Sequence, residues 1–159
     1  MKLILESLGY NFDDEHQIWI RPDYKGIAYN DGDEVENRIF EILKNADDLS
    51  VLSDELKSHC NDWPSTYHLS SSRANILRPF VSHLSGDVLE IGAGCGAITR
   101  YLGDCGGNVL ALEGTPRRAA IASARTRDLD NVIVLSDKFE NFKTNKKFDV
   151  ITLIGVLEY

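Results

Sequence analysis

The sequence predicts an α/β fold in which a doubly wound parallel sheet follows a mixed α+β N-terminal region. From residue 87 on, apolar runs rich in β-branched residues alternate with helical segments: VLEI, VLALE, NVIVL and FDVITLI. Apolar strands separated by helices are typical of a parallel sheet that is covered on both faces. The first 66 residues are acidic and irregular. We therefore expect an N-terminal accessory region at residues 1–66 and the parallel-sheet domain at residues 67–159.

Composition limits the classes of function. The chain has 159 residues, of which 43% are hydrophobic and 26% charged, so it can bury a substantial core. Its formal net charge of -8 disfavours nucleic-acid binding, which requires a basic surface. Cys60, Cys95 and Cys105 show no metal-binding spacing, and their small, odd number is typical of a reduced compartment. The N-terminal residues do not have the pattern expected of a signal peptide, and no apolar run approaches the ~20 residues of a membrane span. We expect a cytoplasmic protein without a bound metal.

The N-terminal region contains several short predicted elements. KLILESL and HQIWIRP are predicted as strands that form an antiparallel pair. Asp31 or Asp33 is predicted to cap the helix in NDGDEVENRIFEILKNA, and Ser53 to cap a second helix in SDELKSHC. DWPSTY is predicted as a turn, and SSSRANILRPFVSHL as an amphipathic helix interrupted near Pro79.

The helices between the apolar runs are ITRYLGDCGG and TPRRAAIASARTRDL. The second has a clear start, with Thr115 as N-cap and Pro116 at the first helical position. The fourth run lies at the end of the chain, where nothing follows to cover its edge. A bare apolar edge favours association. We therefore expect either self-association through this strand or a natural chain that continues past residue 159.

The stretch VLEIGAGCG places Glu90 ahead of three alternating glycines, Gly92, Gly94 and Gly96. The loop follows a strand and opens a helix, which is where parallel sheets bind their ligands. Gly92 would permit the tight turn, and Gly94 and Gly96 would let a ligand lie against the main chain.

The next strand ends at Glu113, and 113 − 92 = 21 residues separate it from Gly92. An acid about 20 residues after such a loop is typical of ribose binding. GAGCGA also satisfies the dinucleotide pattern G-x-G-x-x-A, so an NAD(P)-dependent oxidoreductase is one alternative. Glu90 argues against it, since a carboxylate repels pyrophosphate and suits a cationic adenosyl ligand. A non-catalytic cofactor-binding or assembly module is the other alternative.

Residues 87–159 resemble the first half of a class I S-adenosylmethionine-dependent methyltransferase. VLEIGAGCG matches the first motif of that family, and VLALEGTP, NVIVLSDKFENF and FDVITLIGVLEY resemble the second, third and fourth. Four motifs in the family's order are more specific than any one. The resemblance implies a Rossmann-like sheet and S-adenosylmethionine as cofactor.

The resemblance also implies roles for individual residues. Glu113 would bind the ribose, Asp137 the adenine amino group, and the N–H of Lys138 a ring nitrogen. The segment YHLSSSRANILRPF occupies the place of a helix that touches the cofactor carboxylate, with Tyr67, Arg73 and Arg78 as candidates beside the alternative of a solvated helix face. The predicted cofactor-binding residues are Tyr67, Arg73, Glu90, Gly92, Ala93, Gly94, Gly96, Glu113, Gly114, Asp137 and Lys138.

The expected function is methylation of a small-molecule, saccharide or protein acceptor, with no nucleic-acid partner. No NPPY-like or DPPY-like run follows the fourth strand, which disfavours the methyltransferases that use such a run to methylate the amino groups of adenine or glutamine. The N-terminal region resembles methyltransferase modules of bacterial surface-polysaccharide proteins. Glu158 and Tyr159 are candidates for acceptor contacts. The sequence identifies no catalytic base.

Overall fold

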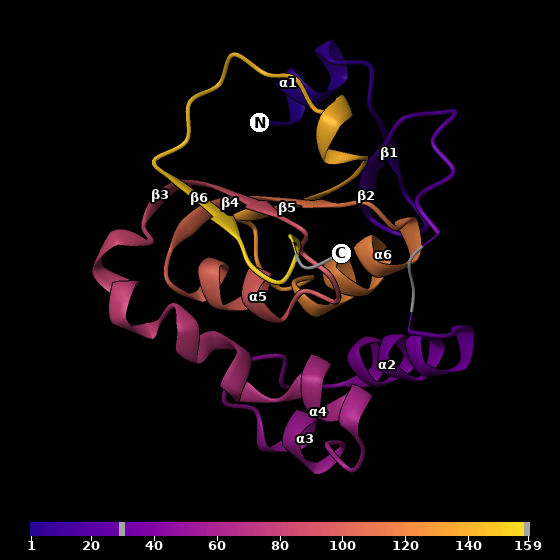
Figure 1. Ribbon diagram of the computed structural model, residues 1–159, viewed down its shortest axis with the longest axis vertical. Helices are drawn as coiled ribbons and strands as arrows, with labels where there is room; N and C mark the ends of the chain where they lie inside the picture. Colours follow the sequence, from indigo (N-terminus) through magenta and orange to yellow (C-terminus); the bar gives the residue numbers. More distant parts are fainter. Residues whose placement is uncertain (29–30, 158–159) are drawn as a thin grey trace.

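The fold is built around one mostly parallel sheet. The computed structural model describes residues 1–28 and 31–157, and within them the six strands lie in the order β1-β2-β5-β4-β3-β6 (Figure 1). The predicted apolar runs form the parallel strands β3 (Gly86–Ile91), β4 (Gly107–Glu113), β5 (Val132–Ser136) and β6 (Val150–Leu153). The chain moves outward from β3 to β5 and then returns to place β6 beside β3. The predicted Rossmann-like α/β fold is confirmed, and its switch point lies between β3 and β6.

Both faces of the central strands are covered. The predicted helices are α5 (Ala97–Asp104) and α6 (Pro116–Arg125), which lie on one face, while α1 (Lys2–Ser7) lies on the other (Figure 1). Successive strand residues point to opposite faces, so each strand contributes to two cores. The first core includes Val88, Leu102, Val109, Ala119 and Val134, and the second includes Leu5, Tyr10, Leu89, Leu110 and Leu135. This double burial explains why the runs are apolar throughout.

The N-terminal segment extends the sheet. Strand β1 (Asn11–Asp13) pairs antiparallel with β2 (Ile18–Ile20), and β2 pairs in parallel with β5 through Trp19 opposite Leu135. The strand predicted in HQIWIRP is confirmed. The strand predicted in KLILESL is wrong, because that segment is α1, which buries Leu5 against the sheet. The proposed boundary at residue 66 stays a prediction, although strands from both sides of it share this sheet.

Three helices form an outer layer (Figure 1). Helix α2 (Asp33–Asn45) packs on α6, α4 (Trp63–Leu69) packs on α2, and α3 (Asp54–Ser58) packs on α4. Helix α2 begins after Gly32, so neither Asp31 nor Asp33 is its N-cap as predicted. The predicted Ser53 cap of α3 is confirmed, since its hydroxyl accepts a hydrogen bond from the Leu56 N–H.

DWPSTY was predicted as a turn, but it belongs to α4. Asp62 accepts a hydrogen bond from the Ser65 N–H at 2.8 Å, and the Ser65 hydroxyl accepts one from the Asp62 N–H at 3.2 Å. This reciprocal capping box stabilises the helix start, and Pro64 fits the first turn.

The helix predicted in SSSRANILRPFVSHL is replaced by two 3-10 helices, η1 (Ser71–Ile76) and η2 (Arg78–His83). The break falls at Leu77, two residues before Pro79, whose ring nitrogen has no N–H to continue the helical hydrogen bonds. The predicted interruption is thus present, but the two halves are 3-10 rather than α-helical. A further 3-10 turn, η3 (Phe139–Asn141), follows β5.

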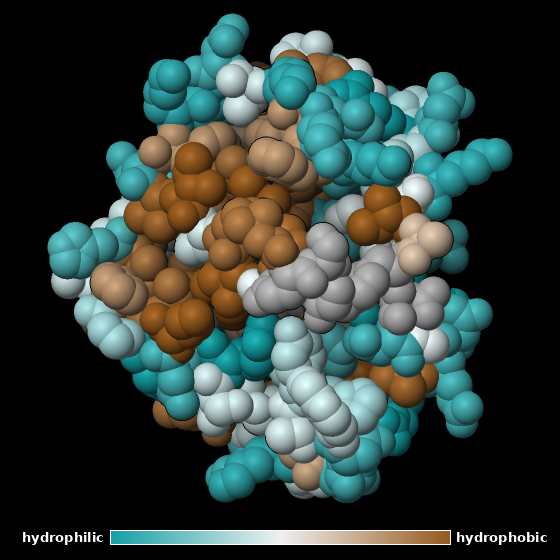
Figure 2. Space-filling view, in the orientation of Figure 1, coloured by the Kyte–Doolittle hydropathy of each residue, from teal (hydrophilic) through white to brown (hydrophobic). Residues whose placement is uncertain are grey.

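Strand β6 forms one edge of the described sheet and pairs only with β3 among residues 1–28 and 31–157. Ile151 and Leu153 on this strand are 61% and 40% exposed, and Figure 2 shows apolar side chains gathered over this side of the molecule. Glu158 and Tyr159 lie outside the described residues. No helix in the described part of the chain is long and apolar enough to span a membrane.

Candidate cofactor-binding site

The glycine loop lies at the carboxyl end of β3, and its three glycines have different surroundings. All three have positive φ, at 79°, 55° and 79° for Gly92, Gly94 and Gly96. A Cβ on Gly92 would lie 2.3 Å from Val156 Cγ2, and one on Gly96 would lie 2.8 Å from Ala122 Cα. A Cβ on Gly94 would meet no atom within 4 Å. Gly94 therefore faces open space, while Gly96 allows the loop to pack against α6.

Two hydrogen bonds hold the loop on the neighbouring strand. The N–H groups of Gly92 and Ala93 both donate to the Leu112 carbonyl, at 2.8 and 3.1 Å. Because Leu112 is the penultimate residue of β4, these bonds bring the loop to the end of that strand. The loop geometry is thus determined by β4 as well as by the glycines themselves.

Glu113 connects the loop to the start of α6. Its Oε2 accepts a hydrogen bond from the Gly94 N–H at 2.7 Å, and its Oε1 accepts one from the Thr115 N–H at 2.9 Å. The side chain is buried. Each carboxylate oxygen can accept a further hydrogen bond, so Glu113 keeps capacity for ligand hydroxyls. The structure therefore brings together two of the residues predicted to bind the cofactor.

Glu90 is buried beneath the same loop. Its Oε2 accepts a hydrogen bond from the Thr99 hydroxyl at 2.6 Å. Burial raises the pKa of Glu90 to about 7, and the nearby Glu113 charge adds to this rise, while the Thr99 hydrogen bond and the Arg73 charge oppose it. A cation next to Glu90 would favour its ionised form.

Tyr67 and Arg73 form a stacked pair near the loop after β6. The Arg73 guanidinium lies 4.3 Å from the centroid of the Tyr67 ring. A Cβ built on Gly155 would lie 3.8 Å from both the Tyr67 hydroxyl and an Arg73 Nη atom. The pair therefore lies at the switch point between β3 and β6, on the Glu90 side of the site.

Arg78, the third candidate on that segment, has other partners. Its Nε donates to Asn75 Oδ1 at 2.8 Å, and its guanidinium lies 5.6 Å from the Tyr101 ring centroid. The structure places this side chain against α5, apart from the Tyr67–Arg73 pair.

Asp137 is fully buried at the end of β5, with both carboxylate oxygens engaged. Oδ2 accepts hydrogen bonds from the Tyr10 hydroxyl at 2.6 Å and from Arg21 Nε at 2.9 Å. Oδ1 accepts from the Lys138 N–H at 2.8 Å and from Asn141 Nδ2 at 3.0 Å. Burial opposes ionisation, but these hydrogen bonds outweigh it and hold the pKa of Asp137 below its ordinary value. The groups expected to contact adenine are thus hydrogen-bonded within the protein.

Gly114 is covered by a segment that the sequence did not associate with the site. The Tyr24 hydroxyl donates to the Gly114 carbonyl at 2.5 Å, and the Ile27 N–H donates to the same carbonyl at 3.2 Å. Neither Tyr24 nor Arg21 could be found from local pattern, because 90 and 116 residues separate them from their partners. A cavity of about 400 Å³ beside this segment is lined by Gly9, Arg21, Pro22, Asp23, Tyr24 and Asn141.

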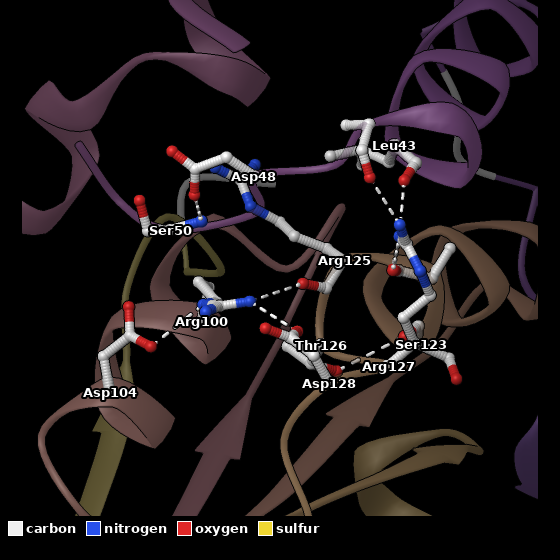
Figure 3. A network of polar contacts seen from close by, with 12 residues as sticks. Leu43, Asp48, Ser50, Arg100, Asp104, Ser123, Arg125, Thr126, Arg127 and Asp128 are labelled. Atoms are coloured by element: carbon white, nitrogen blue, oxygen red, sulfur yellow. Dashed lines mark hydrogen bonds and ion pairs between the residues drawn. The ribbon is translucent and has the colours of Figure 1, made fainter. Parts of the chain in front are cut away.

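An arginine network holds the helical layer at the end of α6 opposite to Glu113 (Figure 3). Arg100 donates to Asp104 at 3.0 Å and to Asp128 at 2.6 Å. Arg127 donates to the Leu43 carbonyl at 2.6 Å and to the Ala46 carbonyl at 2.5 Å, which satisfies the C-terminal end of α2. This network fixes α2 and α5 around α6, and so supports the site from the far side.

Comparisons with known proteins bear on the same segment. The family model described as a methyltransferase domain matches residues 89–159. No curated protein matches the chain significantly.

Several solved structures are similar in fold. The glycopeptide N-methyltransferase MtfA, complexed with sinefungin, is 27% identical over 49% of this chain and 34% of its own, with a TM-score of 0.44. The DhpI–SAH complex is 22% identical over 74% of this chain and 52% of its own, with a TM-score of 0.46. A third structure is that of phosphoethanolamine N-methyltransferase 1 of Haemonchus contortus, in complex with phosphoethanolamine and S-adenosylhomocysteine. It is 19% identical over 74% of this chain and 24% of its own, with a TM-score of 0.46.

The chain thus spans from about a quarter to about half of the length of these three proteins. The family-model match begins within β3 and includes the glycine loop, Glu113 and β6. Over residues 89–159 the chain therefore matches the model of a methyltransferase domain, in the segment whose sequence motifs resemble those of class I S-adenosylmethionine-dependent methyltransferases.

Proposed function

We propose that this chain is the cofactor-binding portion of an S-adenosylmethionine-dependent methyltransferase. The observation that carries the proposal is the open main-chain position at Gly94, whose N–H donates to the buried carboxylate of Glu113, in the loop that follows the buried Glu90. The methyltransferase-domain match over the same residues supports it.

The residues present fit a cationic adenosyl ligand. A Cβ at position 94 would fill the open space next to the loop, so glycine there leaves the main chain accessible. Glu113 carries a negative charge, and a nearby cation would ionise Glu90 as well, which suits a ligand with a sulfonium and an ammonium group and disfavours the pyrophosphate of a dinucleotide. The Glu90 pKa near 7 means that such a ligand would also stabilise the ionised side chain.

Each residue has a role in this proposal. Glu113 would accept hydrogen bonds from ribose hydroxyls, and the Tyr67–Arg73 pair would hold the ligand carboxylate near Gly155. Glu90 would balance the positive charge from beneath the loop. Bound S-adenosylmethionine would supply an activated methyl group, and the protein would contribute alignment of the acceptor with it.

The acceptor is proposed as a small molecule, a saccharide or a protein. The net charge of -8 supports an acceptor other than a nucleic acid. We also propose that the protein is cytoplasmic and that it self-associates through β6.

Thermal unfolding with added ligands tests the function. S-adenosylhomocysteine is expected to raise the melting temperature, since it binds the folded state, and NAD⁺ and NADP⁺ are expected to leave it unchanged. Glu113→Ala should abolish the rise, while Glu34→Ala, which alters an exposed acid on α2, should preserve it. A rise with NAD⁺ and none with S-adenosylhomocysteine would overturn the proposal in favour of an oxidoreductase.

A further inference from the structure

We propose that Ile27 forms the apolar wall against which the nucleobase of the adenosyl ligand packs, in place of a side chain at position 114. This inference rests on the proposed function and assigns a binding role to the N-terminal segment at residues 21–27.

The segment crosses the carboxyl end of β5. Arg21 follows β2, which pairs with β5 on the side away from β4. Ile27, six residues later, hydrogen-bonds to Gly114, which follows β4. Between them the chain passes the end of β5, where Arg21 binds Asp137 at 2.9 Å. The segment therefore covers the strand ends on the β5 side of Glu113.

This is the side on which a base would lie. The groups suited to the charged end of the ligand, Glu90 and the Tyr67–Arg73 pair, lie at β3 and β6. A ligand whose ribose binds Glu113 on β4 and whose charged end points to β3 must direct its base toward β5. The carboxylate of Asp137 there is already bound by Tyr10, Arg21 and Asn141.

The segment is firmly held where it meets β4. Both Tyr24 and Ile27 donate to the single carbonyl of Gly114, at 2.5 and 3.2 Å. Gly26 has a φ of 89°, and a Cβ there would lie 2.6 Å from Pro116 Cδ. The main chain therefore passes too close to the start of α6 for a side chain at position 26.

Ile27 occupies the space that a side chain at position 114 would need. A Cβ on Gly114 would lie 2.8 Å from Ile27 Cδ1. Ile27 is nevertheless 41% exposed, so part of its apolar surface stays available beside Gly114, the residue that follows Glu113. A fixed, half-exposed apolar side chain beside a ribose-binding acid is suited to pack against a flat base.

Calorimetry on Ile27→Ala tests the inference, with S-adenosylhomocysteine and 5′-methylthioadenosine as ligands. Both ligands carry the nucleoside, so we expect both to bind about tenfold more weakly, the factor that accompanies loss of a few buried methyl or methylene contacts. Ile4→Ala is the matched control, because Ile4 is 37% exposed and lies on α1. It should bind both ligands like the parent protein.

A rescue variant tests whether weaker binding comes from loss of the apolar wall or from general damage to the fold. Position 114 does not have a left-handed φ, so it can accept a side chain once Ile27 is truncated. Gly114→Val alone should weaken binding through its clash with Ile27, while the double variant Ile27→Ala/Gly114→Val should bind several-fold better than Ile27→Ala. If Ile27→Ala unfolds, Ile27→Val should still show a two- to threefold loss.

The outcomes distinguish this inference from the proposed function. If the parent protein binds S-adenosylhomocysteine and the Ile27 variants bind it equally well, the inference is overturned and the proposed function stands. If Ile27→Ala weakens S-adenosylhomocysteine but leaves 5′-methylthioadenosine unchanged, the base wall is also overturned. If the parent protein binds neither ligand, the proposed function itself fails.

Discussion

The backbone N–H of Gly94 donates a hydrogen bond to the carboxylate of Glu113 across 2.7 Å. This contact joins the loop after β3 to the end of β4, so the two sequence features expected to bind one ligand already hold each other in place. It also means that Glu113 has a structural role besides any role in binding. Experiments on the site must therefore separate stability from affinity.

Glu113→Ala should lower both the stability of the fold and its affinity for S-adenosylhomocysteine. The substitution removes the carboxylate that accepts hydrogen bonds from the N–H groups of Gly94 and Thr115, and loss of a buried hydrogen-bond acceptor costs about 1–3 kcal/mol. Glu113→Gln keeps one acceptor oxygen and should lose less. Urea unfolding measures the free energy, and Glu140→Ala is the exposed control. Equal stability of the alanine variant and the parent protein would contradict this role.

The variants Gly94→Ala and Gly96→Ala should differ in stability and in ligand binding. Gly94 has open space at its Cβ position, so alanine there adds only the backbone strain of a positive φ, about 1–2 kcal/mol, yet projects a methyl group into the binding site. At Gly96 the new Cβ meets Ala122 at 2.8 Å and must displace α6, which should cost more stability. Thermal unfolding and calorimetry with S-adenosylhomocysteine distinguish them. The assignment fails if Gly94→Ala is the less stable variant and binds normally.

Glu90 should make stability depend on pH. Its pKa is raised from 4.5 to about 7, so its contribution is fully present below pH 4.5 and is lost as pH rises through 7. A pKa difference of this size corresponds to roughly 3 kcal/mol of unfolding free energy. Glu90→Gln should remove this decline between pH 5 and pH 8 in urea unfolding. A parallel decline in the variant would show that another group is responsible.

Replacing Arg21 should destabilise the fold more than replacing a surface arginine. Arg21→Met would leave the fully buried Asp137 with one charged partner fewer, and we expect a loss of about 1–3 kcal/mol. Arg38→Met is a matched control, because the Arg38–Asp62 pair is exposed on both sides and should be worth less than about 1 kcal/mol. Urea unfolding near pH 7 compares them. Equal losses of unfolding free energy in the two variants would mean that burial of Asp137 does not strengthen its ion pair with Arg21.

The same ion pair gives a pH dependence of opposite sign to that of Glu90. The pKa of Asp137 is lowered, so its contribution is present above the ordinary carboxyl pKa and is lost as pH falls through the folded-state value. Asp137→Asn should therefore flatten the acid side of the stability profile. Acid unfolding monitored by circular dichroism measures this, and an unchanged acid midpoint would contradict it.

Local sequence determined the parallel sheet, the glycine loop and the helix that begins at Pro116. These features depend on short-range physics: apolar runs of strand length, glycines at positions of positive φ, and a proline at the first turn. The 21-residue spacing from Gly92 to Glu113 also placed both at adjacent strand ends, because one strand–helix–strand unit separates them.

Tertiary structure alone decided how the N-terminal segment completes this framework. The helical start of the chain, the pairing of β2 with β5, the burial of Asp137 by Arg21 and the cover of Gly114 by Ile27 have no local signature. Each contact joins residues roughly a hundred positions apart, and its free energy comes from burial and pairing that exist only once the sheet has formed.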